Sequence, residues 1–302
     1  MQSLAHAVAA GAPAEQLAAT PVPTQYRAAH LRRSDAEMFR GVDDKDVRKS
    51  IHLGDVPMPE LAPDEVLVAV MASAINFNTV WSAMFEPVST FDMLSRYARQ
   101  GGFAGRHDQD HHVIGSDASG VVVRVGAGVR HWKIGDHVIV SPVHVDDQEP
   151  TTHEDGMLGT GQLAWGYETN FGSLAHFAVA RASQILPKPA HLTWEEAASF
   201  SLCAGTAYRM LVSKNGAQIK QGDIVMIWGA TGGLGAFAVQ MVKNGGGTAV
   251  GIVGSADKVA IAEQLGCDVV INRDLLHIDR DLPLSQRSIA VGKQIGKIIR
   301  TE

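Results

Sequence analysis

The sequence of 302 residues has only two cysteines, no long apolar run and no excess of basic charge. Two cysteines exclude a disulfide-stapled secreted scaffold and a four-cysteine structural zinc site. No segment reaches the roughly 18 apolar residues that a membrane-spanning helix needs, and the Ala-rich residues 1–20 lack the basic head and apolar core of a signal peptide. Because the formal net charge is −6, nothing indicates a nucleic-acid partner. We therefore expect a cytoplasmic protein with neither a membrane nor a nucleic-acid partner.

The remaining composition is that of a globular protein, with 45% hydrophobic and 19% charged residues. At about 100–200 residues per domain, this length predicts two domains. Residues 1–50 are mixed and polar, and we interpret them as a partly helical N-terminal extension. Pro187 and Pro189 indicate a domain boundary, or seam, between two parts of the chain. We therefore place one domain at residues 51–189 and a second at residues 190–302.

The first domain is predicted to be rich in short strands. Residues 65–71, 120–126 and 135–140 are apolar, β-branched and bounded by Gly or Asp, and residues 171–180 are a further candidate. Such a series of strands is typical of a compact β-rich unit.

After the seam the pattern changes to alternating strands and helices. Thr193 and Glu196 have the spacing of a capping box, which predicts the start of a helix, and a second helical stretch is predicted at residues 206–212. Three strands and two helices are then predicted in the order βαβαβ, at residues 223–228, 234–242, 248–253, 258–265 and 268–271. This order is the first half of a doubly wound dinucleotide-binding fold.

A glycine-rich loop joins the first of these strands to the helix that follows. Glycine lets the backbone turn sharply and approach a diphosphate without a Cβ in the way, while the helix N-terminus directs its amides at the phosphates. A purely structural glycine-rich turn is the alternative, but the surrounding βαβαβ order favours a cofactor site. The candidate cofactor-binding residues of the loop are Gly229, Ala230, Thr231, Gly232, Gly233, Leu234 and Gly235.

The end of the second strand favours NADPH over NADH. An NAD site places Asp or Glu there to accept from the ribose 2′-hydroxyl, whereas this chain has Gly254. Ser255 and Lys258 are suited to hold a 2′-phosphate, and we expect Asp257 to face solvent in the first helical turn. A lysine on a helix is more often solvated surface, so Lys258 alone carries little weight.

Residues 112–122 resemble a segment of the medium-chain dehydrogenase/reductase superfamily. In zinc alcohol dehydrogenases of that superfamily this segment carries a His-Glu pair, but here the two places hold Ser116 and Asp117. A catalytic zinc needs three protein ligands, and we expect none here. The neighbouring pair His111-His112 is better explained as part of a polar loop than as a metal site. The resemblance therefore implies hydride transfer without a metal.

Four segments carry a narrower resemblance, to crotonyl-CoA carboxylase/reductase: residues 48–53, 75–81, 85–91 and 165–172. The resemblance implies a GroES-like catalytic domain beside a Rossmann cofactor domain, both in an α/β protein. It also implies NADPH-dependent reductive carboxylation of an α,β-unsaturated acyl-CoA, such as crotonyl-CoA, to an alkylmalonyl-CoA. The resemblance further implies that relatives with longer acyl specificity supply polyketide extender units and that full-length relatives are homo-oligomers.

The same resemblance suggests which residues bind CO₂. Asn78 would supply an amide donor, Tyr167 would form part of a wall, and Glu168 would hold a hydrogen-bonded network around the gas. In isolation, an Asn after a strand is more often a turn or cap residue, and a Glu in a polar loop is more often solvated. Tyr167 stands where the family usually has Phe.

Several other residues are better explained by packing in the core than by a role in binding or catalysis. Trp81, Phe85, Phe91 and Tyr97 are placed either in the core or around an acyl pocket, with the core favoured. The two cysteines, Cys203 and Cys267, are interpreted as small buried hydrophobic residues.

Only three strands of a six-strand dinucleotide fold are predicted in the second domain. The sequence therefore suggests a C-terminally truncated chain, which we expect to fold poorly and to be inactive alone. Two other functions stay open: a reductase of enoyl-CoA or quinone that does not carboxylate, and a non-catalytic remnant that only binds nucleotide.

Overall fold

The computed structural model describes residues 3–277, 279 and 281–301. It divides into two compact units, Met1–Leu202 and Cys203–Glu302, with the division inside helix α5 (Trp194–Leu211). The boundary that the sequence suggested between residues 189 and 190 stays a proposal.

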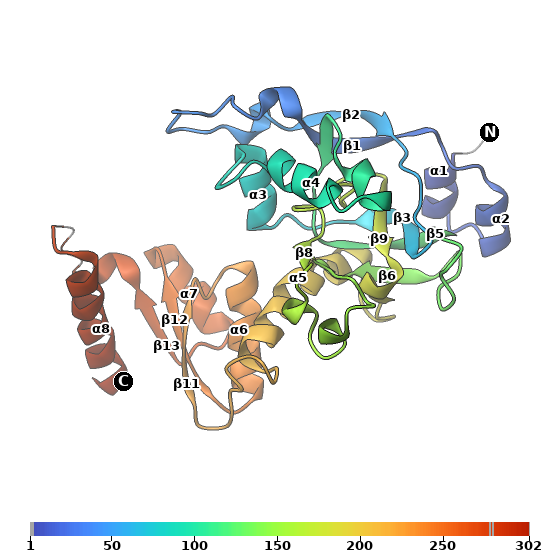
Figure 1. Ribbon diagram of the computed structural model, residues 1–302. Helices are drawn as coiled ribbons and strands as arrows, with labels where there is room; N and C mark the ends of the chain where they lie inside the picture. The colour runs from blue at the N-terminus through green and yellow to red at the C-terminus, as the bar shows by residue number, and fades with distance from the viewer. Residues whose placement is uncertain (1–2, 278, 280, 302) are drawn as a thin grey trace. The chain divides into compact units, whose positions relative to one another are not determined.

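The first unit is built on a five-stranded sheet (Figure 1). Its strands run in the spatial order β10-β6-β5-β3-β9, and each neighbouring pair is antiparallel. Val66, Val68 and Val122 are fully buried on one face of this sheet. Four strands that the sequence predicted are confirmed: β3 (Glu65–Ala72), β5 (Ala118–Val125), β6 (His137–Val140) and β9 (Phe177–Arg181), of which β9 begins later than the predicted residue 171. The sequence did not predict β10 (Ile185–Pro187).

A second sheet in this unit contains β1 (Gln25–Arg32), which the sequence did not predict. It lies between β2 (His52–Pro57) and β4 (His111–Val113), and both pairings are antiparallel. The polar loop expected at His111-His112 is wrong, because this pair forms β4. The remaining elements of the unit are α1 (Leu4–Ala9), α2 (Ala14–Ala19), α3 (Phe77–Met84), α4 (Thr90–Ala98) and the short pair β7 (Val143–His144) and β8 (Leu163–Ala164).

The second unit is a three-stranded parallel sheet with helices on both faces. Its strands β11 (Ile224–Trp228), β12 (Thr248–Val253) and β13 (Val269–Asn272) pair in that order. Buried side chains of α6 (Gly233–Asn244) pack against Ile227 and Ala249. Those of α8 (Leu284–Thr301) pack against Val250, Ile252 and Ile271.

The βαβαβ order is completed by α7 (Val259–Gln264), which precedes β13. With this half of a Rossmann domain and the β-rich first unit, the predicted α/β fold class is confirmed. The capping box at the start of α5 also forms as predicted: Thr193 Oγ1 accepts from the Glu196 amide, and the Glu196 carboxylate accepts from the Thr193 amide. One long helix replaces the two predicted helical stretches. Across the described residues, no helix is both long and apolar enough to span a membrane.

Candidate active site

Asn78 lies in the first turn of α3 and is tied to a neighbouring segment. Its Nδ2 donates to Ser116 Oγ at 2.7 Å, and its Oδ1 accepts from the Thr79 amide at 3.0 Å. The side-chain amide carries two N–H groups, and the described residues supply a partner for one of them. Asn78 is half-buried. Its second N–H is therefore available as a neutral donor.

The segment that holds Asn78 is itself buried and fixed. Ser116 is 1% exposed and Asp117 is fully buried. The Asp117 carboxylate accepts from Asn76 Nδ2, from the Ser201 hydroxyl and from the Leu202 amide, at distances of 2.7, 2.5 and 2.8 Å. Burial raises the pKa of Asp117 to about 6, although these three donors pull it down. Because Asn76 caps α3, residues 116 and 117 together anchor the start of the helix.

The loop of residues 165–172 packs directly onto the same segment. Gly166 has φ +69°, and a Cβ at this position would lie 1.9 Å from the carbonyl oxygen of Gly115. A Cβ at Gly172 would lie 2.5 Å from that oxygen, which also accepts from the Ser173 amide at 3.0 Å. Glycine is therefore required at both positions for this close approach.

Glu168 and Tyr167 are carried by this loop. Glu168 Oε2 accepts from the Ala164 amide at 2.8 Å, and its other carboxylate oxygen lies 3.7 Å from a guanidinium nitrogen of Arg96. Tyr167 is half-buried, and its pKa is raised by burial and by the nearby Glu168 charge. The structure thus places Asn78 against Ser116 and the loop that carries Tyr167 and Glu168 against the adjacent Gly115. It records no direct contact between Asn78 and Glu168.

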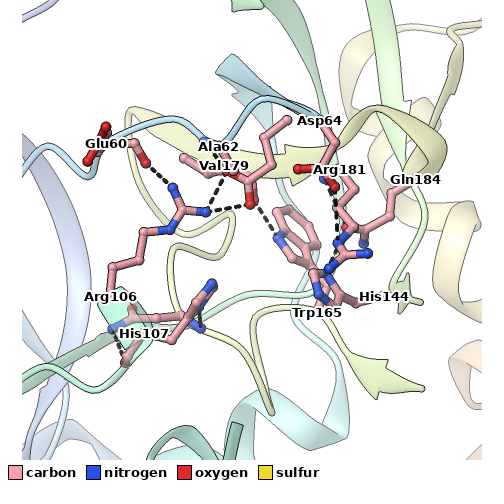
Figure 2. Close-up of polar contacts among 12 residues, drawn as sticks. Glu60, Ala62, Asp64, Arg106, His107, His144, Trp165, Val179, Arg181 and Gln184 are labelled. Carbon is pink, nitrogen blue, oxygen red and sulfur yellow. Dashed lines mark hydrogen bonds and ion pairs between the residues drawn. The ribbon is translucent and has the colours of Figure 1, made fainter. Parts of the chain in front are cut away.

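A polar network lies around Trp165, the first residue of the loop (Figure 2). Trp165 Nε1 donates to the Val179 carbonyl at 2.8 Å. Nearby, Arg106 forms a buried ion pair with Glu65. His144 Nδ1 lies 3.1 Å from Gln184 Oε1, and its Nε2 lies 2.9 Å from the Tyr97 hydroxyl.

The hydrogen bonds of this network fix the protonation of His144. Gln184 Nε2 donates to the Ser141 carbonyl, so Gln184 Oε1 is an acceptor. His144 Nδ1 must then carry the proton, and its Nε2 accepts from Tyr97. The ring is neutral, and burial lowers its pKa to about 4.

Two further neutral histidines hold one end of the loop, at Thr169 and Asn170. His107 Nδ1 accepts from the Asn170 amide at 3.0 Å, and burial lowers the pKa of His107 to about 2. His112 is fully buried between Thr90 Oγ1 and the Thr169 carbonyl, and burial lowers its pKa to about 4. The loop that carries Glu168 is therefore held by groups that must stay uncharged.

The described part of the chain contains no group of three or more His, Cys, Asp or Glu side chains arranged to hold a metal ion. Ser116 and Asp117, at the places of a zinc His-Glu pair, are engaged in the hydrogen bonds given above. That hydride transfer proceeds without a metal ion stays a proposal.

In the second unit, the glycine loop leads from β11 into α6 as the sequence predicted. Gly229 has φ +73°, and a Cβ at Gly235 would lie 2.2 Å from the Gly229 carbonyl oxygen. A Cβ at Gly233 would lie 2.8 Å from Cys203 Sγ, and Ala230 is fully buried. The tight turn and the exposed start of a twelve-residue helix fit a dinucleotide diphosphate. Thr231, Gly232 and Leu234 complete the loop.

At the end of β12, the structure adds a cation that sequence reasoning missed. Gly254 stands at the strand end, and a Cβ there would lie 3.3 Å from Nη2 of Arg273. Arg273 directly follows β13 and is exposed. Lys258 is exposed on the next turn, while Asp257 bonds to the Ser255 side chain, which lowers the Asp257 pKa. Only the parallel pairing of β12 with β13 brings Arg273 to this edge.

The candidate aromatic residues divide between core and surface. Phe85, Phe91 and Tyr97 are buried, as the core interpretation predicts. Trp81 is 41% exposed and packs edge-on against the exposed Phe77. Cys203 is buried and Cys267 is half-buried.

Comparisons with known proteins agree with this architecture. Residues 62–190 match the alcohol dehydrogenase GroES-like domain. The chain is 51% identical over 259 residues to a crotonyl-CoA reductase from Streptomyces avermitilis. The aligned region covers 85% of this chain and 58% of the relative. It is 42% identical to a crotonyl-CoA carboxylase/reductase from Cereibacter sphaeroides, over 72% of this chain and 48% of the relative.

The solved structure of the 2-octenoyl-CoA carboxylase reductase CinF from a Streptomyces species is 66% identical to this chain. It superposes with a TM-score of 0.93 and covers 98% of this chain and 68% of CinF. A second CinF structure, in complex with NADP and 2-octenoyl-CoA, superposes with a TM-score of 0.95.

A GroES-like unit followed by a Rossmann-type unit defines the medium-chain dehydrogenase/reductase class of oxidoreductases. Within that class, the chain belongs to the crotonyl-CoA carboxylase/reductase family. It spans about 58% of the length of the curated Streptomyces relative.

Proposed function

We propose that this chain contributes the CO₂-binding residues and the first half of the NADPH site of an enoyl-CoA carboxylase/reductase. The observation that carries the proposal is the meeting of two separate segments at residues 115 and 116. One brings the amide of Asn78, and the other brings Tyr167 and Glu168.

NADPH, when bound, supplies the hydride that adds to the β-carbon of the enoyl thioester. The addition leaves an enolate whose charge is shared by the α-carbon and the thioester oxygen. The enolate forms a carbon–carbon bond to CO₂, giving an alkylmalonyl-CoA, or takes a proton, giving the saturated acyl-CoA. The chain's own residues decide between these fates by holding CO₂ close and keeping water away.

Asn78 suits this task because CO₂ is uncharged and has two weakly accepting oxygens. A neutral N–H can donate to such an oxygen at little cost, whereas a charged side chain would draw in water. Ser116 occupies one N–H of the amide, and we assign the other to CO₂. In the proposal Tyr167 forms part of the wall of the site.

Glu168 serves in this proposal as the acceptor for a hydrogen-bonded network around CO₂. The Ala164 amide fixes one of its carboxylate oxygens, and the other faces Arg96. The carboxylate is therefore held on the loop with its second oxygen open to a bound water.

The choice of nicotinamide cofactor depends on the positive charge near Gly254. We predict that Lys258→Ala weakens NADPH binding by about tenfold and leaves NADH binding almost unchanged, because only NADPH carries the 2′-phosphate. Arg273→Ala is expected to behave in the same way, with a larger effect, since guanidinium binds phosphate through two donors. Cofactor fluorescence titration measures both constants.

The matched control is Lys297→Ala, which removes the same charge from a different element, α8. A loss of NADH affinity equal to the loss of NADPH affinity would contradict the assignment.

Turnover is tested in what we call the completed chain: residues 1–302 joined to the CinF segments that they do not cover. The proposal predicts NADPH oxidation with 2-octenoyl-CoA or crotonyl-CoA and a carboxylated product when bicarbonate is present. A saturated acyl-CoA as sole product would instead indicate a reductase that only protonates. NADPH binding without oxidation would indicate a nucleotide-binding remnant.

The 302 residues alone are expected to bind NADPH weakly and to be inactive, because they supply only three described strands of the cofactor unit. Steady NADPH oxidation by residues 1–302 with crotonyl-CoA and bicarbonate would contradict this expectation.

A further inference from the structure

We propose that Ser116 is a positioning residue for the carboxylation step, acting through the amide of Asn78. The inference rests on the proposed CO₂ site and assigns to the chain a determinant of product choice beyond the residues that would touch CO₂.

The contact is a single, partly buried hydrogen bond. Ser116 Oγ lies 2.7 Å from Asn78 Nδ2 and is its recorded acceptor, while Ser116 itself is 1% exposed. An Asn side chain is terminated by one donor and one acceptor of nearly equal shape. The Thr79 amide can only donate, so it determines which end of the group is Oδ1. The Ser116 oxygen then accepts from the nitrogen and holds that end of the amide in place.

The contact with Thr79 does not hold the side chain by itself. Asn78 Oδ1 accepts from the amide of the next residue, Thr79. A contact with an adjacent residue constrains the side chain less than a partner 38 positions away. Without Ser116 the nitrogen end of the amide loses its fixed partner, and the second N–H no longer keeps one direction toward CO₂.

The position of Ser116 is in turn fixed by its neighbour. Asp117 is fully buried and binds Asn76 at the cap of α3 as well as Ser201 and the Leu202 amide of α5. Ser116 and Asp117 therefore bind two residues at the N-terminus of α3, Asn78 and Asn76. Such a double attachment fixes both the place and the direction of the Asn78 amide.

The test replaces Ser116 by alanine in the completed chain. The ratio of carboxylated to saturated product is expected to fall about fivefold at a fixed low bicarbonate concentration, as for the loss of one ordinary hydrogen bond. The rate of NADPH oxidation is expected to change less than the ratio. Higher bicarbonate should restore the ratio, because the variant binds CO₂ less well and does not lose the hydride step.

Ser119→Ala is the matched control. Ser119 is fully buried three residues farther along the chain, in β5, and its hydroxyl donates to the Trp194 carbonyl instead of contacting Asn78. The control should keep the parent product ratio even if its stability falls. An equal fall in Ser119→Ala and Ser116→Ala would overturn the proposal.

A double-mutant cycle separates positioning from general damage. In an Asn78→Ala background, Ser116→Ala is expected to leave the product ratio unchanged, since no amide remains to be positioned. A further fivefold fall in that background would overturn the proposal. Ser116→Thr, which keeps the hydroxyl acceptor, should retain the parent ratio, and a ratio as low as that of Ser116→Ala would also overturn it.

Different results would contradict the proposed carboxylation and the role of Ser116. If the completed chain makes only saturated product, the proposed carboxylation is wrong whatever Ser116 does. If it carboxylates and the Ser116→Ala ratio equals that of the parent, only the role of Ser116 is wrong. Should Ser116→Ala fail to fold, Ser116→Cys supplies the same comparison, because sulfur is a weaker acceptor than a hydroxyl oxygen.

Discussion

Replacing Asn78 by leucine is expected to turn the completed chain from a carboxylase into a simple reductase. Leucine has nearly the shape of asparagine but no N–H, so CO₂ loses its neutral donor while the hydride step keeps its geometry. We expect the ratio of carboxylated to saturated product to fall by more than about tenfold. Product masses after NADPH is consumed, at a fixed bicarbonate concentration, give the ratio.

Glu168→Ala is expected to shift the ratio in the same direction, because the network that it anchors disappears with the carboxylate. Glu168→Gln keeps an oxygen for the Ala164 amide and should retain more of the parent ratio. Asn244→Leu makes the same substitution as Asn78→Leu at the exposed end of α6, and it is the control for that variant. An unchanged ratio in both Asn78→Leu and Glu168→Ala would contradict the roles assigned to them.

The first unit is expected to lose stability steeply below about pH 6.5. His107, His112 and His144 are buried and neutral, with pKa values near 2, 4 and 4 that burial has lowered. In the unfolded chain a histidine titrates near pH 6.5. Between pH 6.5 and the folded pKa, protons bind the unfolded state and not the folded one, so stability is present above pH 6.5 and is lost as the pH falls.

Each of these histidines is expected to lower the free energy of unfolding at pH 5 by about 2 kcal/mol relative to pH 7. Asp117 acts in the opposite direction. Its folded pKa, raised to about 6 by burial, lies above its unfolded value, so protonation of Asp117 between about pH 6 and pH 4 favours the folded state. This single carboxyl offsets only part of the stability that the three histidines lose, so the free energy of unfolding still falls by on the order of several kcal/mol.

Denaturant unfolding of the completed chain at pH 7.5 and pH 5 measures this loss. His144→Gln removes one of the three titrating groups and should reduce the difference between the two pH values, although the variant is less stable at both. His153→Gln, on an exposed loop, should leave the difference unchanged. Equal stability of the parent at pH 7.5 and pH 5 would show that these histidines are not held neutral.

Local patterns were sufficient for most elements of the second unit. Each strand there is a short apolar run between glycines or charged residues, and the helix after residue 232 has a clear apolar face. The strand β1 was not recognised, because its outward residues Gln25 and Arg27 are polar and its buried residue Ala28 is small. Its identity depends on β2 and β4, which lie more than 20 residues away.

The candidate site could be predicted only in part. Asn78, Tyr167 and Glu168 were identified through a family resemblance, since an isolated Asn or Glu has no chemical signature. Ser116 could not be recognised as the partner of Asn78, because a hydrogen bond across 38 positions has no local pattern. Arg273 was missed for the same reason, since it reaches Gly254 only when β12 and β13 pair.

The central claim is that one enolate, formed by hydride addition, is captured by CO₂ at this site. The most direct measurement supplies the completed chain with NADPH carrying deuterium at the transferred position, with ¹³C-bicarbonate and with 2-octenoyl-CoA, and then determines the product by mass spectrometry and NMR. The account predicts a single alkylmalonyl-CoA with deuterium on the β-carbon and ¹³C in a carboxylate on the α-carbon. A product with deuterium on the β-carbon but no ¹³C would contradict it.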